Sequence, residues 1–307
     1  MKVNYVITGD SNVKLGLTNL IHDESVDLVF TSPPYTEQRK KIYNSIPQKE
    51  YVDWFMKISK HIHRILKPTG SFVINIKENV RKKERQTYVI ELILEMKKNG
   101  WVWIDEYCWF KTNSFPGYWE NRFRDTWERV LHFSKQTDIK FFRNNVQNPI
   151  GDWSKKRLSS SYITESDLTR KYSSTGSGFH RKVSNWIGKK TVDPHNGLKF
   201  KNENYLITED DKSLLNTNVI ELPPVNKSGK NVQNHSASFP LQLPHWFIRL
   251  LTEEGDLVLD PFCGIGTTNI SSILLNRNHI GIDIEKRFVS QARKNIKSIH
   301  LSTSNPS

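Results

Sequence analysis

The chain has 307 residues, 36% of them hydrophobic, and its 45 Lys and Arg side chains against 32 Asp and Glu give a formal net charge of +13. This length allows about two domains, and the absence of a long apolar run excludes a membrane span. Only two cysteines occur, Cys108 and Cys263, so neither a disulfide scaffold nor a zinc site is expected. No charged-then-apolar leader precedes the first strand, so we expect an intracellular protein whose positive charge favours a polyanionic partner.

The first 135 residues predict alternating strands and helices. The strongest helix pattern lies in 51–66, where apolar residues recur at helical spacing. The expected order is a strand in 5–10, a strand in 25–31, a helix in 51–66, a stop at 67–70, a strand in 71–76, a helix in 86–99 that ends at Gly100, and two longer strands in 101–111 and 126–135. We expect the last two strands to pair in antiparallel fashion.

Residues 140–230 have little periodicity, and their basic residues predict contact with nucleic acid. The stretch 151–200 holds ten basic and four acidic side chains. Aromatic residues are interleaved with them, namely Trp153, Tyr162, Tyr172, Phe179 and Trp186. Cations bind phosphates and flat side chains stack on bases, so the combination is typical of nucleic-acid binding. On net charge alone, a basic surface that only keeps the protein soluble remains the alternative. The same choice applies to the charge run "RKKER" at 81–85, which we interpret as solvated, with phosphate contact as the lesser alternative.

From residue 238 onward the pattern is strand, glycine loop, helix, strand, helix. The first strand ends in Asp260, the loop contains Gly264 and Gly266, and the second strand ends in Asp283. Glycines let a backbone approach a ligand closely, and an acid at the tip of the second strand can accept hydrogen bonds from a ribose. Asn269 stands where a dinucleotide fingerprint has its third glycine, so a smaller nucleoside ligand is favoured. The alternative is an ordinary tight turn between strand and helix.

A doubly wound sheet needs more parallel strands than the C-terminal part contains. The missing strands must come from the N-terminal part, which predicts a circularly permuted sheet. Ligands bind outside the carboxyl ends of such strands. The stretch "TSPPY" at 31–35, which follows a predicted buried strand, should therefore face the same crevice as Asp260 and Asp283.

The pairing of "TSPPY" early with "DPFCGIGTT" late resembles the amino-methyltransferases of DNA, in the class whose catalytic motif precedes the S-adenosylmethionine motif. The resemblance implies a Rossmann-like, S-adenosylmethionine-dependent methyltransferase sheet, circularly permuted, with an inserted target-recognition region. The implied divisions are a catalytic half at 1–139, the recognition region at 140–230 and a cofactor-binding half at 231–307. It also implies a cytoplasmic prokaryotic enzyme that acts on double-stranded DNA without a metal or a membrane, in a type II restriction-modification system with a cognate endonuclease.

The same resemblance assigns site residues by motif. The catalytic ones are Ser32, Pro33, Pro34 and Tyr35. The cofactor-binding ones are Asp10, His235, Ser238, Phe239, Pro240, Asp260, Pro261, Phe262, Gly264, Gly266, Thr267 and Asp283.

The chemistry explains why these residue types suit methylation of an exocyclic amino group. The lone pair of such a nitrogen is delocalised into the base, and oxygens of Ser32 and Pro33 could accept its hydrogens and aim the lone pair at the methyl group. Tyr35 would stack on a base flipped out of the duplex. Methylation of a ring carbon typically requires a cysteine in a Pro-Cys setting, and no such dipeptide occurs. Because the motif begins with Ser32, we expect cytosine N4 as the target; adenine N6, or a DNA-binding protein of the same fold without activity, are the alternatives.

Overall fold

The computed structural model describes residues 1–36, 46–112, 118–146, 218–224 and 239–303. The chain forms two compact units, one of Met1–Phe141 with Asn218–Ser307 and one of Phe142–Thr217. In the second unit the described residues are 142–146, with a short 3-10 turn, η1, at Arg143–Asn145. The elements of the first unit are β1 (Tyr5–Thr8), α1 (Ser11–Gly16), β2 (Val26–Thr31), α2 (Gln48–Ile65), β3 (Leu66–Ile76), β4 (Val80–Arg81), β5 (Glu84–Arg85), α3 (Tyr88–Lys98), β6 (Val102–Phe110), β7 (Trp127–Ser134), β8 (Val219–Glu221), α7 (Gln242–Leu251), β9 (Leu257–Asp260), α8 (Thr267–Leu274), β10 (Asn278–Asp283) and α9 (Lys286–Thr303).

An eight-stranded sheet in the order β1-β10-β9-β2-β3-β7-β6-β8 organises the first unit. All neighbours pair in parallel except β7, which is antiparallel to both β3 and β6. The prediction of an antiparallel pair of long strands is therefore confirmed. Because β6 runs parallel to β2 and β3, its carboxyl end lies at the same edge of the sheet as theirs.

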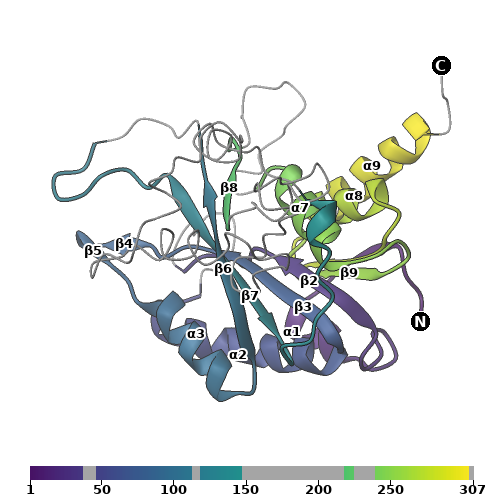
Figure 1. Ribbon diagram of the computed structural model, residues 1–307, viewed down its shortest axis with the longest axis horizontal. Coiled ribbons are helices and arrows are strands. Elements are labelled where there is room, and N and C mark those ends of the chain that lie inside the picture. The colour runs from purple at the N-terminus through teal and green to yellow at the C-terminus, as the bar shows by residue number, and fades with distance from the viewer. Residues whose placement is uncertain (37–45, 113–117, 147–217, 225–238, 304–307) are drawn as a thin grey trace, which may run out of the picture. The chain divides into compact units, whose positions relative to one another are not determined.

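The circular permutation predicted from the strand count is also confirmed. β1 pairs with β10, and β2 pairs with β9, so the two C-terminal strands lie side by side between two N-terminal ones. Figure 1 shows β2 and β9 side by side although more than two hundred residues separate them in the sequence. All six residues of β2 and all four of β9 are buried, as expected for central parallel strands covered on both faces.

Helices cover both faces of the sheet. α1, α2 and α3 pack together on one face, and α7, α8 and α9 lie on the other (Figure 1). The apolar residues that recur at helical spacing in the sequence form the buried face of α2, namely Tyr51, Phe55, Ile58, Ile62 and Ile65. A buried aromatic or aliphatic side chain of this size contributes about 1.5–3 kcal/mol, so this stripe is sufficient to hold α2 on the sheet.

The helix stop predicted at 67–70 is confirmed, but the next strand, predicted in 71–76, begins earlier than expected. α2 ends at Ile65 as expected, but β3 already begins at Leu66 and includes the Lys-Pro-Thr-Gly stretch. The pairing with β2 shifts between Val26 and Leu28, so the extra residues of β3 bulge opposite Asp27. Lys67 then reaches both carboxylate oxygens of Asp27 at 2.8 Å. Pro and Gly end helices but also occur at strand bulges, so the sequence pattern alone does not separate this stretch from the strand that follows.

β8 lies within 140–230 in the sequence, yet it pairs with β6 in the large sheet. The boundary between the compact units falls at Asn218, just before this strand. Among the described residues, no helix is both long and apolar enough to cross a membrane.

Candidate active site

The S-P-P-Y stretch follows directly from β2, at the carboxyl edge of the sheet. Pro33 is buried, whereas Ser32, Pro34 and Tyr35 are partly exposed. The next residue, Thr36, is fully buried and is held by the amide of Asn79, which donates to the Thr36 carbonyl at 3.1 Å and to its hydroxyl at 2.9 Å. The stretch is therefore fixed at both ends, by β2 before it and by the segment after β3 behind it.

The Tyr35 hydroxyl is the centre of a polar network at this edge. It donates to Glu128 Oε2 at 2.9 Å, and Lys111 Nζ contacts the other oxygen, Glu128 Oε1, at 2.5 Å. Burial of the hydroxyl and the negative charge of Glu128 raise the pKa of Tyr35 well above its usual value. Tyr35 thus remains a neutral donor at any physiological pH, with its ring held in one orientation.

Asp260 connects the two sequence motifs. Its Oδ1 accepts a hydrogen bond from the Thr31 hydroxyl at 2.6 Å, and its Oδ2 accepts one from the Thr268 hydroxyl at 2.7 Å. The backbone N–H of Phe262 donates to Oδ1 at 3.0 Å. Burial raises the pKa of Asp260 to about 6, although the two threonine hydroxyls oppose the shift. The residue before S-P-P-Y is therefore bonded directly to the first residue of D-P-F-C-G, and the two motifs share one edge.

The second predicted acid, Asp283, holds the glycine loop. Its carboxylate accepts from the backbone N–H of Gly264 at 2.9 Å and from that of Glu285 at 2.9 Å. Gly264 and Gly266 have φ values of +52° and +87°, in the left-handed region that favours glycine. Burial raises the pKa of Asp283, which is 5% exposed. Asp283 and Gly264, predicted to share a ligand, are thus in direct contact.

Asn269 occupies the position where the dinucleotide fingerprint has its third glycine. In the dinucleotide fingerprint that glycine allows close packing of helix against strand. Here Asn269 faces Gly281 of β10, where an added Cβ would lie 2.8 Å from Asn269 Oδ1 and 3.0 Å from Cys263 Sγ. The strand therefore carries a glycine where the helix has Asn269, and a side chain at position 281 would collide with Asn269 and Cys263.

The other predicted residues fall into three groups. Pro261, Phe262 and Thr267 belong to the same loop, and Phe262 packs against Trp54 of α2 with ring centroids 5.7 Å apart. Asp10 is exposed and caps α1, accepting from the Val13 N–H at 3.2 Å. The third group is the stretch before α7: Phe239 and Pro240 are buried, Phe239 packs edge-on against Phe30 of β2, and His235 and Ser238 lie outside the described residues.

Sequence reasoning missed four residues of this edge as functional candidates: Thr31, Lys111, Glu128 and Asn79. The last two carry a signal that could have been used. Glu128 stands in a strand pattern otherwise rich in apolar side chains, and Asn79 follows a buried strand directly. A carboxylate at a buried strand position, here 8% exposed, needs a partner. The identity of that partner depends on the fold.

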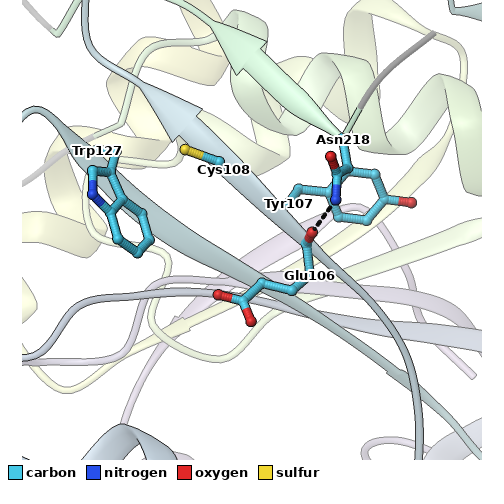
Figure 2. Close-up of a pocket in the computed structure, with 5 residues that line it drawn as sticks. All are labelled: Glu106, Tyr107, Cys108, Trp127 and Asn218. Atoms are coloured by element: carbon cyan, nitrogen blue, oxygen red, sulfur yellow. Dashed lines mark hydrogen bonds between the residues drawn. The ribbon is translucent and has the colours of Figure 1, made fainter. Parts of the chain in front are cut away.

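A pocket of about 380 Å³ lies on the β6 side of the sheet (Figure 2) and is lined by Glu106, Tyr107, Cys108, Trp127 and Asn218. Asn218 Nδ2 donates to the Glu106 carbonyl at 2.9 Å and closes one wall. Burial and the nearby Glu106 charge raise the pKa of the Cys108 thiol, and burial with Asp260 and Asp283 nearby raises that of Cys263. Neither cysteine is activated as a nucleophile, since reactivity requires the thiolate.

The sheet order, its one antiparallel strand and the acid-bearing glycine loop after β9 define a class: the fold is a Rossmann-like, S-adenosylmethionine-dependent methyltransferase sheet, circularly permuted. A family model described as DNA methylase matches residues 26–294, and the chain belongs to that family. The family resemblance carried by S-P-P-Y and D-P-F-C-G and the expected fold class are thus both confirmed.

Three comparisons illustrate the likeness. The chain is 31% identical over 291 residues to the type II methyltransferase M.PvuII of Proteus hauseri, covering 92% of this chain and 80% of that protein. The solved structure of the PvuII DNA methyltransferase, named as cytosine-N4-specific, superposes with a TM-score of 0.64 at 25% identity, covering 95% of this chain and 86% of that one. The TTHA0409 protein of Thermus thermophilus, solved in complex with S-adenosyl-L-methionine, shares the fold with a TM-score of 0.56 at 21% identity, over 95% of this chain and 93% of that one.

Proposed function

We propose that this protein transfers a methyl group from S-adenosyl-L-methionine to the exocyclic N4 of a cytosine in double-stranded DNA. The observation that supports this most directly is the Thr31–Asp260 hydrogen bond of 2.6 Å, which joins the S-P-P-Y segment to the glycine loop. A group bound by the glycine loop and a base held by S-P-P-Y would then lie on the same edge of the sheet. The name of the PvuII enzyme, cytosine-N4-specific, supports the choice of atom.

The residues of the glycine loop fit the cofactor. When bound, S-adenosylmethionine supplies an electrophilic methyl group on a sulfonium. A carboxylate offers about four acceptor sites, and Asp283 uses two of them on the Gly264 and Glu285 N–H groups. The remaining sites suit the hydroxyl donors of a ribose. Pro261, Phe262, Gly266 and Thr267 line the same loop, and we assign Asp10, His235, Ser238, Phe239 and Pro240 to the cofactor site by family motif alone.

At the target base, residues of this chain orient the amino group and hold the flipped base. The Pro33 carbonyl and the Ser32 oxygen accept the two hydrogens of the amino group, which directs the nitrogen lone pair at the methyl carbon. Pro33 and Pro34 have fixed φ values, so the acceptor carbonyl does not have to be ordered on binding. Tyr35 stacks on the flipped base while Glu128 holds its hydroxyl. With S-adenosylmethionine bound, the amino nitrogen would take the methyl group and would release one proton to an adjacent oxygen or to solvent, while the sulfur would leave as a neutral thioether.

Asp260 has a different role in this scheme from the one its motif suggests. Its two oxygens are bonded to Thr31, Thr268 and the Phe262 N–H, and the residue is 1% exposed. It therefore would not contact the cofactor itself but would hold the glycine loop in place, because its hydrogen bonds connect the end of β9 to the end of β2. We propose Asp260 as a positioning residue.

In this proposal, the 140–230 region recognises the DNA sequence through its interleaved basic and aromatic side chains. Most of that region lies outside the described residues, and Phe142–Thr217 forms a compact unit of its own. The type II name of the M.PvuII relative supports a restriction-modification setting, with an endonuclease that cuts the same site when it is unmethylated.

The test is methylation of a plasmid or genomic DNA with labelled S-adenosylmethionine, followed by digestion to nucleosides and chromatography with mass detection. N4-methylcytosine is the expected product. N6-methyladenine would show that Ser32 does not select cytosine, and no incorporation into DNA of diverse sequence would overturn the enzymatic proposal. Resistance of the methylated plasmid to one class of restriction site would then identify the recognition sequence.

A further inference from the structure

We infer that residues 118–127, here called the aromatic loop, and the β4–β5 hairpin together form a second surface that contacts duplex DNA, separate from the 140–230 region. The inference rests on the proposed function, because it names the elements of the methyltransferase unit that hold the substrate. In Figure 1 the hairpin lies at the left of the view, away from α7, α8 and α9.

The aromatic loop exposes its largest apolar side chains. Phe123 is 95% exposed and Tyr118 is 89% exposed, while Trp119 and Trp127 are 43% and 39% exposed. Four exposed aromatic rings within ten residues are unusual for a surface that binds nothing, because exposed apolar groups that gather in one region usually mark a binding site. The guanidinium of Arg122 lies over the Trp119 ring at 4.4 Å, so cation and ring already occur as a stacked pair.

The polar side chains of the same loop point to the hairpin. Asn121 Nδ2 donates to the Lys83 carbonyl at 2.8 Å, Glu120 pairs with Lys83, and Asp125 pairs with Arg85 at 2.7 Å. An isolated bridge between Trp119 and Arg122 closes the turn at the tip. The polar side chains of the loop therefore bind the hairpin, while its aromatic side chains are exposed to solvent. Stability alone would favour the opposite, with aromatic side chains buried and polar ones exposed.

The hairpin turn carries an independent signal. Its two central residues, Lys82 and Lys83, have φ values of +48° and +68°. Turns of this kind favour Asn and Gly, because a side chain with a Cβ is strained in the left-handed region. Two lysines at these positions place cations at the tip of a short hairpin at the expense of local stability. Strain of this kind concentrates at functional sites.

Both elements are connected to the S-P-P-Y segment. The hairpin begins one residue after Asn79, which holds Thr36, and the aromatic loop ends one residue before Glu128, which holds Tyr35. A duplex that delivers a flipped base to Tyr35 must lie against the neighbouring elements of this edge. The surface is thus continuous with the proposed base-binding segment.

The positive charge of this surface favours a polyanionic partner, and its exposed rings favour one with bases on which they can stack. The hairpin and the aromatic loop carry six basic and three acidic side chains, namely Arg81, Lys82, Lys83, Arg85, Arg122, Arg124 and Glu84, Glu120, Asp125. Basic side chains contact phosphates, and exposed rings stack on bases or insert between them where a nucleotide has left the stack. Duplex DNA with a flipped-out nucleotide offers both phosphates and unstacked base faces.

The experiment measures the affinity of the full-length protein for a duplex by fluorescence anisotropy over a series of salt concentrations. Phe123→Ala and Tyr118→Ala should each weaken binding at least fivefold, since one stacked base accounts for about 1–3 kcal/mol. Lys82→Gln should reduce the slope of log affinity against log salt by about one. The matched controls are Leu94→Ala, which removes a 56% exposed apolar group from α3, and Lys97→Gln on the same helix. Both should bind DNA and S-adenosylmethionine as the wild type does.

The outcomes separate this inference from the proposed function. If Phe123→Ala and Tyr118→Ala bind the duplex as tightly as Leu94→Ala, the inference is wrong, whatever the wild type methylates. If they change the sedimentation coefficient of the protein but not its affinity for DNA, the surface is a protein interface and the inference is again wrong. If they weaken DNA binding while the wild type transfers no methyl group, the surface stands and the methyltransferase proposal fails alone.

Discussion

Replacing Glu128 with Leu should slow methyl transfer strongly while leaving the cofactor affinity nearly unchanged. Leucine has about the same volume as the glutamate side chain, so the packing should change little. The substitution removes the carboxylate that accepts a hydrogen bond from the Tyr35 hydroxyl at 2.9 Å and pairs with Lys111 at 2.5 Å. Glu128 is 8% exposed, so solvent cannot replace these bonds in full. The Tyr35 ring would then lose its fixed orientation toward the base.

The magnitude follows from the type of bond that is lost. A hydrogen bond to a charged group stabilises by about 1.5–3 kcal/mol, so a transition state that requires this bond should form roughly 10 to 150 times more slowly. Single-turnover methyl transfer measures the rate, and isothermal titration measures the affinity for S-adenosylmethionine. Since Glu128 lies on β7 and the glycine loop follows β9, the affinity should change less than threefold, a bound of about 0.7 kcal/mol.

Two variants control for misfolding. Glu128→Gln keeps an oxygen acceptor for Tyr35 and should retain more activity than Glu128→Leu. Tyr35→Phe removes the same bond from the other side, so combining it with Glu128→Leu should cost little beyond either change alone. A Glu128→Leu protein with wild-type single-turnover rates, or additive losses in the double variant, would refute the role of Glu128 as a positioning residue.

Three further predictions concern the base, the connection between the motifs and the fold. Tyr35→Ala should lower methyl transfer far more than cofactor affinity in the same two assays; equal losses would make Tyr35 structural. The pKa of Asp260 is raised to about 6 in the fold, so its contribution to stability is present below pH ~4 and is lost as the pH rises through 6, by about 3 kcal/mol. Denaturant unfolding should therefore show that Asp260→Asn gains stability relative to the wild type between pH 4 and 7, and a pH-independent difference would contradict the assignment. Asp27→Ala should lower the free energy of unfolding by about 3–5 kcal/mol, because Asp27 is 2% exposed and bonded to Lys67 and the Leu257 N–H; a loss below about 1 kcal/mol would show that solvent replaces these bonds.

Much of the fold could be predicted because its information is local or topological. Helical spacing of apolar residues predicted α2, and the short C-terminal part required strands from the N-terminal part, which β1 and β2 supply. Pro68 and Gly70 correctly predicted the end of α2, but they did not show that 67–70 already belongs to β3, because Pro and Gly mark both helix ends and strand bulges. Only the pairing of β3 with β2 around Asp27 distinguishes the two.

The sequence by itself determined the family, through two motifs whose residue types are set by chemistry, and it determined that these motifs must meet at one sheet edge. The tertiary structure decided how they meet: Thr31 and Asp260, 229 positions apart, share one hydrogen bond. It also decided that Tyr35 is held by Glu128 and that the rings at 118–127 face outward. The reason is physical, since spacing along the chain constrains the backbone, whereas the partner of a buried polar side chain depends on segments that only folding brings together.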